Sequence, residues 1–334
     1  MYKKGGSYLK KYDIIIIGGG LSGMTAALSA REKGIENILI LEREDYLGGI
    51  LIQCIHNGFG VNSIQENITG PEYAQHFIDK VKHSNIDYKL NTMVLDLNKN
   101  KVITAVNPDL GIIEYKAKSI ILATGCREKY NGNINVPMNK YAGIYTLGSA
   151  HKFINFQGYL PGKNVVILGS SDIALIVSRR LIIEGAKVKA IVEKQPYILA
   201  HRKNVSRCIE DFNLPVKVGY SITEVLGKER VQGVKISRID ENGKFLKDSE
   251  ELIECDCLLL SVGWMPESDL PEKAKIKMSI ATGGPEVKDN FETSQAGVFA
   301  CGNLIHTYSW ADDIALEGYE VGNSATDYIE NYLK

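Results

Sequence analysis

YDIIIIGGGLSGMTAALSAREKGIENILILER, residues 12–43, contains a strand, a glycine turn, a helix and a second strand in that order. Ile14–Ile17 is an apolar β-branched run, which predicts a parallel strand buried on both faces. Glu42 ends the second apolar run, and three glycines stand between the first strand and the helix at GxGxxG spacing: Gly18, Gly20 and Gly23. This arrangement is typical of a dinucleotide-binding α/β unit.

Each glycine of the turn has a distinct predicted role. Gly18 permits the tight turn, Gly20 lets the backbone approach a pyrophosphate, and Gly23 lets the helix pack close to the strand. The pyrophosphate is expected at the helix N-terminus, where unpaired N–H groups favour negative charge. Glu42 is placed to accept hydrogen bonds from ribose hydroxyls.

A second copy of the unit follows in NVVILGSSDIALIVSRRLIIEGAKVKAIVEK, residues 164–194, at a constant offset of 151 residues. Gly169 matches Gly18 and Glu193 matches Glu42, but Ser171 and Ala174 replace the other two glycines. The Cβ and hydroxyl of Ser171 stand where a pyrophosphate would approach. Two interpretations stay open: a working NAD site, or a retained fold that binds its nucleotide weakly or not at all. Glu193 would repel the 2′-phosphate of NADP and therefore favours NAD.

The bulk composition limits the class of protein. A chain of 334 residues is long enough for two domains, each with its own core. The formal net charge of −1 argues against a nucleic-acid binder, and no apolar run reaches the roughly 18 residues of a membrane span. The six cysteines are scattered without metal-type spacing, which predicts no metal site and a reduced, cytoplasmic protein. A lysine-rich start is expected to form a solvated leader: Lys3, Lys4, Lys10 and Lys11.

Three later segments each predict a strand ending in a glycine turn: KSIILATGCR (118–127), CLLLSVGWMP (257–266) and GVFACGN (297–303). With the two glycine units, their order over about residues 12–330 resembles that of the flavoproteins with two dinucleotide-binding domains. That superfamily includes thioredoxin reductases, glutathione reductases and NADH oxidases. The resemblance implies an α/β fold of two Rossmann-like, three-layer ββα domains. The NAD(P)-binding domain, 156–267, would be inserted into a discontinuous FAD-binding domain, 1–155 and 268–334.

The resemblance also implies which residues hold the cofactors. FAD is expected to contact residues in the first unit and the later turns: Gly18, Gly20, Leu21, Ser22, Gly23, Glu42, Arg43, Gly49, Ala123, Thr124, Gly125, Gly302 and Asn303. NAD(H) is expected as a substrate on the second unit: Gly169, Ser171, Ala174, Glu193 and Gly263. Hydride would pass between nicotinamide C4 and flavin N5 in stacked rings, which needs no side-chain acid or base.

A closer resemblance lies in four segments: LEREDYLGGILIQCIHNGFG (41–60), NITGPEY (67–73), NFQGYLPGKNVVILGS (155–170) and FETSQAGVFACGNLIH (291–306). These are similar to FAD/NAD-dependent oxidoreductases associated with glycerol-3-phosphate dehydrogenases of anaerobic bacteria. The similarity implies an oxidoreductase that exchanges electrons with a glycerol-3-phosphate dehydrogenase-type flavoprotein subunit. Whether the chain forms a homo-oligomer stays open.

The positions of the cysteines bear on which class of flavin enzyme the chain belongs to. Disulfide reductases of the superfamily use two neighbouring cysteines, but Cys54 has Phe59 where a partner would stand, and no CxxC occurs. An enzyme outside the dithiol-disulfide reductase class is therefore expected. Cys54 and His56 are flavin-proximal candidates for a single redox thiol, as in a free-standing NADH oxidase or NADH:acceptor reductase; a small packed residue is the alternative. Ser171 and Ala174 support a third reading, a flavin electron-transfer subunit that no longer binds NAD.

Overall fold

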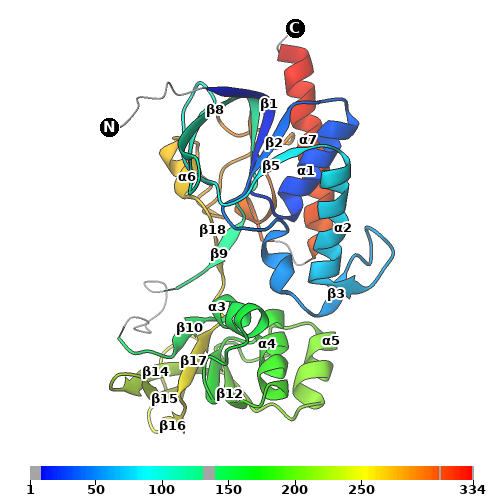
Figure 1. Ribbon diagram of the computed structural model, residues 1–334. Helices are drawn as coiled ribbons and strands as arrows, with labels where there is room; N and C mark the ends of the chain where they lie inside the picture. Colours follow the sequence, from blue (N-terminus) through cyan, green and yellow to red (C-terminus); the bar gives the residue numbers. More distant parts are fainter. Residues whose placement is uncertain (1–8, 131–139, 308–309, 333–334) are drawn as a thin grey trace, which may run out of the picture. The chain divides into compact units, whose positions relative to one another are not determined.

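The computed structural model describes residues 9–130, 140–307 and 310–332, which divide into two compact units (Figure 1). Unit 1 comprises Met1–Arg127 and Met265–Lys334, and unit 2 is Glu128–Trp264. Unit 2 is therefore an insertion in the sequence of unit 1. The predicted domain limits after residues 155 and 267 stay predictions.

Unit 1 is built on one sheet with the strand order β5-β2-β1-β8-β7-β6, in which β19 also pairs with β8. Its strands are β1 (Lys10–Ile17), β2 (Ile38–Leu41), β5 (Asp87–Lys89), β6 (Met93–Leu97), β7 (Val102–Asn107), β8 (Gly111–Leu122) and β19 (Val298–Ala300). β1 runs parallel to β2 on one side and to β8 on the other, and β19 is parallel to the end of β8. The carboxyl ends of β1, β2, β8 and β19 therefore meet at one edge of the sheet.

Three helices cover one face of this sheet: α1 (Leu21–Glu32), α2 (Gly70–His83) and α7 (Ala311–Tyr332) (Figure 1). Ile14 and Ile16 of β1 pack under these helices, whereas Ile15 and Ile17 belong to the cluster on the opposite face. The strand is thus buried on both faces, as its apolar run predicts. Short elements complete the unit: η1 (Gly49–Gln53), β3 (Asn57–Phe59), β4 (Ile68–Thr69), α6 (Asp269–Lys273) and η4 (Gly302–Leu304).

Unit 2 repeats the plan with a parallel sheet in the order β10-β17-β11-β12-β13. Its strands are β10 (Ile144–Thr146), β11 (Asn164–Leu168), β12 (Lys187–Glu193), β13 (Val216–Val218) and β17 (Cys257–Leu260). One face carries α3 (Leu147–Lys152), η2 (Phe153–Gln157), α4 (Asp172–Ile183), α5 (Arg202–Asn204) and η3 (Val205–Glu210). The other face carries an antiparallel sheet of β14 (Tyr220–Gly227), β15 (Val231–Arg238) and β16 (Glu251–Glu254).

The chain enters and leaves unit 2 through two paired strands, β9 (Cys126–Glu128) and β18 (Trp264–Pro266). The predicted α/β class with two Rossmann-like units is confirmed. The predicted leader is wrong at Lys10 and Lys11, which form the start of β1; Lys3 and Lys4 lie outside the described residues. Within the described ranges, no helix is both long enough and apolar enough to cross a membrane.

Candidate functional site

The first glycine turn brings backbone segments closer together than side chains allow. Gly18 has φ +111°, and a Cβ there would lie 2.3 Å from the carbonyl oxygen of Ala123. A Cβ on Gly23 would lie 2.0 Å from the carbonyl oxygen of Gly18. At Gly20, by contrast, a Cβ would meet no described atom within 4 Å. The turn thus fixes strand, helix and β8 tightly together and leaves open space above Gly20.

Gly20 is also the N-cap residue of α1, and no side chain of the described residues caps this helix end. The first N–H groups of a helix have no partner within the helix, and the helix dipole makes this end positive. A diphosphate would supply acceptors and negative charge in the space above Gly20. The residues present therefore fit a dinucleotide.

Glu42 braces the same turn. One of its carboxylate oxygens accepts a hydrogen bond from the Gly19 N–H at 2.6 Å, and the other accepts from the Glu44 N–H at 2.8 Å. The side chain is only 7% exposed, so it is held in one orientation. Each carboxylate oxygen keeps a further lone pair, with which it can also accept from a ribose hydroxyl.

The other residues predicted for FAD gather around this turn. Gly49 approaches Gly20, since a Cβ on Gly49 would lie 3.2 Å from the Gly20 Cα. A Cβ on Gly302 would lie 2.6 Å from the Ser22 hydroxyl oxygen. Unit 1 therefore places at one edge of its sheet the full predicted set: Gly18, Gly20, Leu21, Ser22, Gly23, Glu42, Arg43, Gly49, Ala123, Thr124, Gly125, Gly302 and Asn303. Arg43 is the most exposed charged member, and its guanidinium pairs with Glu267 at 3.7 Å.

Unit 2 reproduces the turn down to its hydrogen bonds. Gly169 has φ +102°, and a Cβ there would lie 2.0 Å from the carbonyl oxygen of Ser261. Glu193 accepts from the Ser170 N–H and from the Gln195 N–H, both at 2.8 Å. These hydrogen bonds are the counterparts of those from Gly19 and Glu44 to Glu42. Donors and acceptor are all offset by 151 residues, so the repeat includes the hydrogen bonds of the glutamate.

The helix end of unit 2 differs from that of unit 1. The Ser171 hydroxyl accepts from the Ala174 N–H at 3.3 Å and lies 2.7 Å from the Ser261 hydroxyl oxygen. Asp172 adds a carboxylate in the first turn of α4, and it accepts from the backbone N–H of His201 at 2.9 Å. One N–H group at the N-terminus of α4 is therefore already hydrogen-bonded, so fewer N–H groups remain there to bind a phosphate. Gly263, with φ +107°, turns the chain after β17.

Cys54 and His56 lie after the Gly48–Gly49 turn, at the end of η1. Burial raises the pKa of the Cys54 thiol to about 12, and its sulfur contacts the Ile50 carbonyl oxygen at 3.4 Å. Burial lowers the pKa of His56, whose ring lies against Phe59 with centroids 5.1 Å apart. At neutral pH the Cys54 thiol is therefore protonated, and a protonated thiol is a poor nucleophile.

Sequence reasoning assigned no side-chain role to Asp312, which belongs to a buried network at the start of α7. The Asp312 carboxylate, 2% exposed, accepts from the Ser63 hydroxyl at 2.5 Å and from the Tyr73 hydroxyl at 2.9 Å. In the same helix, Glu317 accepts from the Gly302 N–H at 2.5 Å. The adjacent acids Asp312 and Asp313 at a helix start were the available signal, since acids are enriched in first helical turns.

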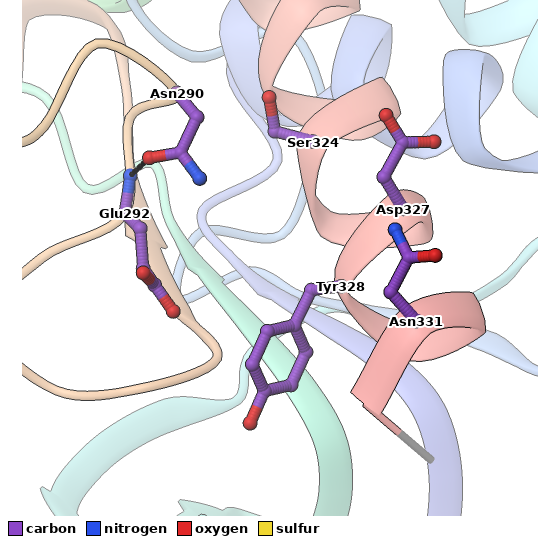
Figure 2. A pocket seen from close by; sticks show the side chains of 6 residues that line it. All are labelled: Asn290, Glu292, Ser324, Asp327, Tyr328 and Asn331. Atoms are coloured by element: carbon purple, nitrogen blue, oxygen red, sulfur yellow. Dashed lines mark hydrogen bonds between the residues drawn. The ribbon is translucent and has the colours of Figure 1, made fainter. Parts of the chain in front are cut away.

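Two cavities lie away from the glycine turns. In unit 1, a polar pocket of about 150 Å³ is formed by the last turns of α7 and the loop before β19 (Figure 2). Its lining residues are Asn290, Glu292, Ser324, Asp327, Tyr328 and Asn331. In unit 2, a pocket of about 470 Å³ lies near the amino end of β11. Both adjoin the amino-terminal edge of their sheet, whereas ligands of open α/β sheets bind at the carboxyl edge, so we assign the nucleotides to the turns.

The chain is similar over most of its length to two classes of reductase. It is 24% identical to a ferredoxin–NADP reductase of Picrophilus torridus, over 97% of this chain and 95% of that protein. It is 26% identical to a thioredoxin reductase of Bacillus subtilis, over 88% of this chain and 87% of that protein. In structure it resembles the thioredoxin reductase of T. acidophilum with a TM-score of 0.78, at 24% identity, over 95% of this chain and 98% of that one. The thioredoxin reductase of Lactococcus lactis gives a TM-score of 0.77, at 18% identity, over 96% and 99%.

These similarities correct one expectation. The chain was expected to stand outside the dithiol-disulfide reductases because it has no CxxC and no partner for Cys54 at the required spacing. That exclusion is wrong, since thioredoxin reductases are among both the sequence relatives and the structural neighbours. Cysteine spacing describes only one local arrangement of two thiols, whereas the similarity to thioredoxin reductases extends over most of the chain.

The family model for pyridine nucleotide-disulphide oxidoreductases matches residues 12–320, which include both glycine turns and both glutamate braces. Members of this family use FAD and NAD(P)H, and the open space above Gly20 fits the diphosphate of such a cofactor. The chain belongs to the pyridine nucleotide-disulphide oxidoreductase family.

Proposed function

We propose that this chain is an NAD(P)H-dependent flavin oxidoreductase that binds FAD on unit 1 and NAD(H) on unit 2. The observation that carries the proposal is the duplicated glycine turn, in which a buried glutamate braces the backbone in each unit: Glu42 to Gly19, and Glu193 to Ser170. When bound, FAD supplies a two-electron acceptor for hydride from the nicotinamide. The protein's own part is to bind and orient the two nucleotides.

In unit 1, the N-terminus of α1 and Gly20 would hold the diphosphate, and Glu42 would accept from the adenosine ribose. Gly302 and Asn303 follow β19, on the other side of β1 from Glu42. A dinucleotide lying across the carboxyl edge with its ribose at Glu42 would therefore extend its flavin half toward Gly302 and Asn303.

In unit 2, we propose NAD rather than NADP as the preferred nucleotide. Both oxygens of the buried Glu193 carboxylate accept from backbone N–H groups, so its charge is fixed at the end of β12. A 2′-phosphate placed there would meet this negative charge. We therefore expect a lower Kd for NAD⁺ than for NADP⁺. The E193Q variant removes the negative charge, so the difference between these two Kd values should become smaller.

Replacing Ser171 by glycine should strengthen nucleotide binding in unit 2. The S171G change frees the Ala174 N–H and removes the Cβ from the approach to α4, so we expect the Kd for NAD⁺ to fall about fivefold. A Ser-to-Gly change at an N-cap costs only a few tenths of a kcal/mol, so the fold should be unaffected. Isothermal titration calorimetry with NAD⁺ measures the first effect, and the Kd for FAD in the same variant is the control. An unchanged NAD⁺ affinity would show that the Ser171 cap does not compete with the ligand.

The electron partner is a finer part of the proposal. The resemblance of residues 41–60, 67–73, 155–170 and 291–306 to oxidoreductases associated with glycerol-3-phosphate dehydrogenase supports a flavoprotein subunit of that type. The relatives' names point to two other acceptor proteins, ferredoxin and thioredoxin. NADH-dependent reduction of each of the three, followed with the same enzyme preparation, distinguishes them. A cytoplasmic location belongs to the same proposal and rests on the scattered positions of the six cysteines, which have no metal-type spacing.

Anaerobic titration with NADH tests the central reaction. We expect the bound flavin to lose its absorbance near 450 nm as NADH is added, and the loss to be complete after about one equivalent of NADH per flavin. If the flavin stays oxidised with NADH and with NADPH, hydride transfer is ruled out. The self-capped helix of unit 2 then favours the second candidate, a flavin electron-transfer subunit that binds no nicotinamide nucleotide.

A substitution of Cys54 tests the remaining alternative, in which that thiol reacts with oxygen or peroxide. Because burial raises the pKa of Cys54 to about 12, we expect C54A to keep NADH oxidation with oxygen within about twofold of the parent. Loss of oxygen- or peroxide-dependent turnover, with NADH bleaching intact, would instead assign the redox role to Cys54.

A further inference from the structure

Helices α1 and α7 run parallel and in close contact along one face of unit 1 (Figure 1). A Cβ on Gly318 would lie 2.0 Å from the Thr25 hydroxyl oxygen and 2.6 Å from the Ser22 carbonyl oxygen. One turn later, a Cβ on Gly322 would lie 2.3 Å from the Ala26 carbonyl oxygen. The contacts advance in the same direction along both helices, so the helices are parallel, and glycine is what allows the close approach.

The register of this contact places the start of α7 well beyond the start of α1. Gly318 is seven residues after the first residue of α7, Ala311, whereas Ser22 is one residue after the first residue of α1, Leu21. Gly318 approaches both Ser22 and Thr25, so at 1.5 Å per residue α7 begins roughly 5–9 Å before the start of α1 along their shared direction and projects past the N-terminus of α1. Its first turn thus lies beside any molecule that extends outward from the N-terminus of α1.

The strand order decides which half of that molecule it would be. Glu42 directly follows β2 on one side of β1. On the other side lie β8, β19 and Gly302, after which the chain leads to α7. On the proposed function, on which this step rests, the adenosine half lies toward Glu42 and the flavin half toward the start of α7.

At that start, one buried carboxylate joins three parts of unit 1. Asp312 of α7 accepts from the Asn62 N–H at 3.3 Å and the Ser63 hydroxyl at 2.5 Å, both in the loop after β3. It also accepts from the hydroxyl of Tyr73 in α2 at 2.9 Å, and this hydroxyl lies 2.7 Å from the Ser63 oxygen. Tyr73 is fully buried and Asp312 is 2% exposed, so water screens this charge little.

A carboxylate at this place opposes the helix dipole. The positive end of α7 would stabilise the negative charge that reduction adds to a flavin, but an acid in the first helical turn compensates that positive end. We propose that Asp312 is a positioning residue that holds the loop carrying Asn62 and Ser63 against α7 and sets the reduction potential of the flavin to a lower value.

The test is the redox equilibrium of FAD-loaded protein with a dye of known potential, measured anaerobically by absorbance. Removing a buried charge within about 10 Å of a redox centre changes such an equilibrium roughly tenfold at an effective dielectric of about 20. We expect D312N to increase the ratio of reduced to oxidised flavin about tenfold at a fixed dye ratio, which is about 30 mV for a two-electron couple.

Two variants separate charge from packing. D313N removes the same charge from the exposed neighbour in the same helical turn and should shift the ratio less than twofold. Y73F removes one donor but keeps the Asp312 charge; it should shift the ratio less than D312N does and should speed hydrogen exchange in residues 60–65. Should D312N not fold, as judged by thermal unfolding of the apoprotein, D312S is measured in its place with the same expected direction.

The outcomes distinguish this inference from the function on which it rests. If the parent protein takes up no FAD, the proposed function fails before the potential is measured. If FAD binds but D312N leaves the ratio within twofold of the parent, or D313N shifts it as much, the role of Asp312 is overturned.

Discussion

The variant G20V is expected to lose FAD binding while keeping its fold. Gly20 has extended backbone angles, φ −73° and ψ −175°, which valine adopts readily, and its Cβ would meet no described atom within 4 Å. The added isopropyl group would instead fill the space where the diphosphate approaches the N-terminus of α1. Losing about two charge-assisted hydrogen bonds at roughly 1.5 kcal/mol each weakens binding about 100-fold.

The measurement is a titration of apoprotein with FAD, followed by quenching of the flavin fluorescence. Thermal unfolding of the apoprotein should change little, because exchanging glycine for an apolar residue at an N-cap costs about 1 kcal/mol or less. The matched control is S171V, which places the same side chain at the equivalent position of unit 2 and should leave FAD binding intact. A Kd for FAD within threefold of the parent in G20V would remove the first glycine turn from the proposed site.

The sequence was sufficient for those parts of the site that depend on the backbone. The roles of Gly18 and Gly23 could be predicted from the sequence. At both positions a Cβ would overlap a carbonyl oxygen, so only glycine fits, and glycine is visible in the sequence. The repeat at 151 residues is equally visible, since the same turn needs the same small residues and the same terminal acid. What the sequence did not reveal is that Glu42 and Glu193 bind the backbone of the turns themselves, because that depends on the side-chain rotamer.

Contacts between distant segments escaped sequence reasoning. Tyr73 and Asp312 are 239 residues apart, and no local sequence pattern links the two positions. Lys10 and Lys11 were misassigned for a related reason: lysine is a weak strand former, but β1 is extended at this end by parallel pairing with Tyr115 and Lys116 of β8. In both cases tertiary pairing outweighs the local signal.

The variant G18A is expected to destabilise unit 1 by about 4 kcal/mol. Alanine at φ +111° is strained by roughly 1–3 kcal/mol, and its Cβ would lie 2.3 Å from the Ala123 carbonyl oxygen, an overlap that costs a similar amount through displacement of β8. The control is G111A. Gly111 also has positive φ, +69°, but a Cβ there would meet no described atom within 4 Å, so this variant measures backbone strain without the overlap.

Because the chain folds as two compact units, the unfolding experiment has to assign the loss to one of them. Trp264 belongs to unit 2 and Trp310 to unit 1, so W264F and W310F backgrounds give each unit its own fluorescence signal in urea. G18A should lower the transition reported by Trp310. G169A, whose Cβ would lie 2.0 Å from the Ser261 carbonyl oxygen, should lower the transition reported by Trp264. If G18A costs no more than G111A, the close approach of β8 to the turn is not what makes glycine necessary at position 18.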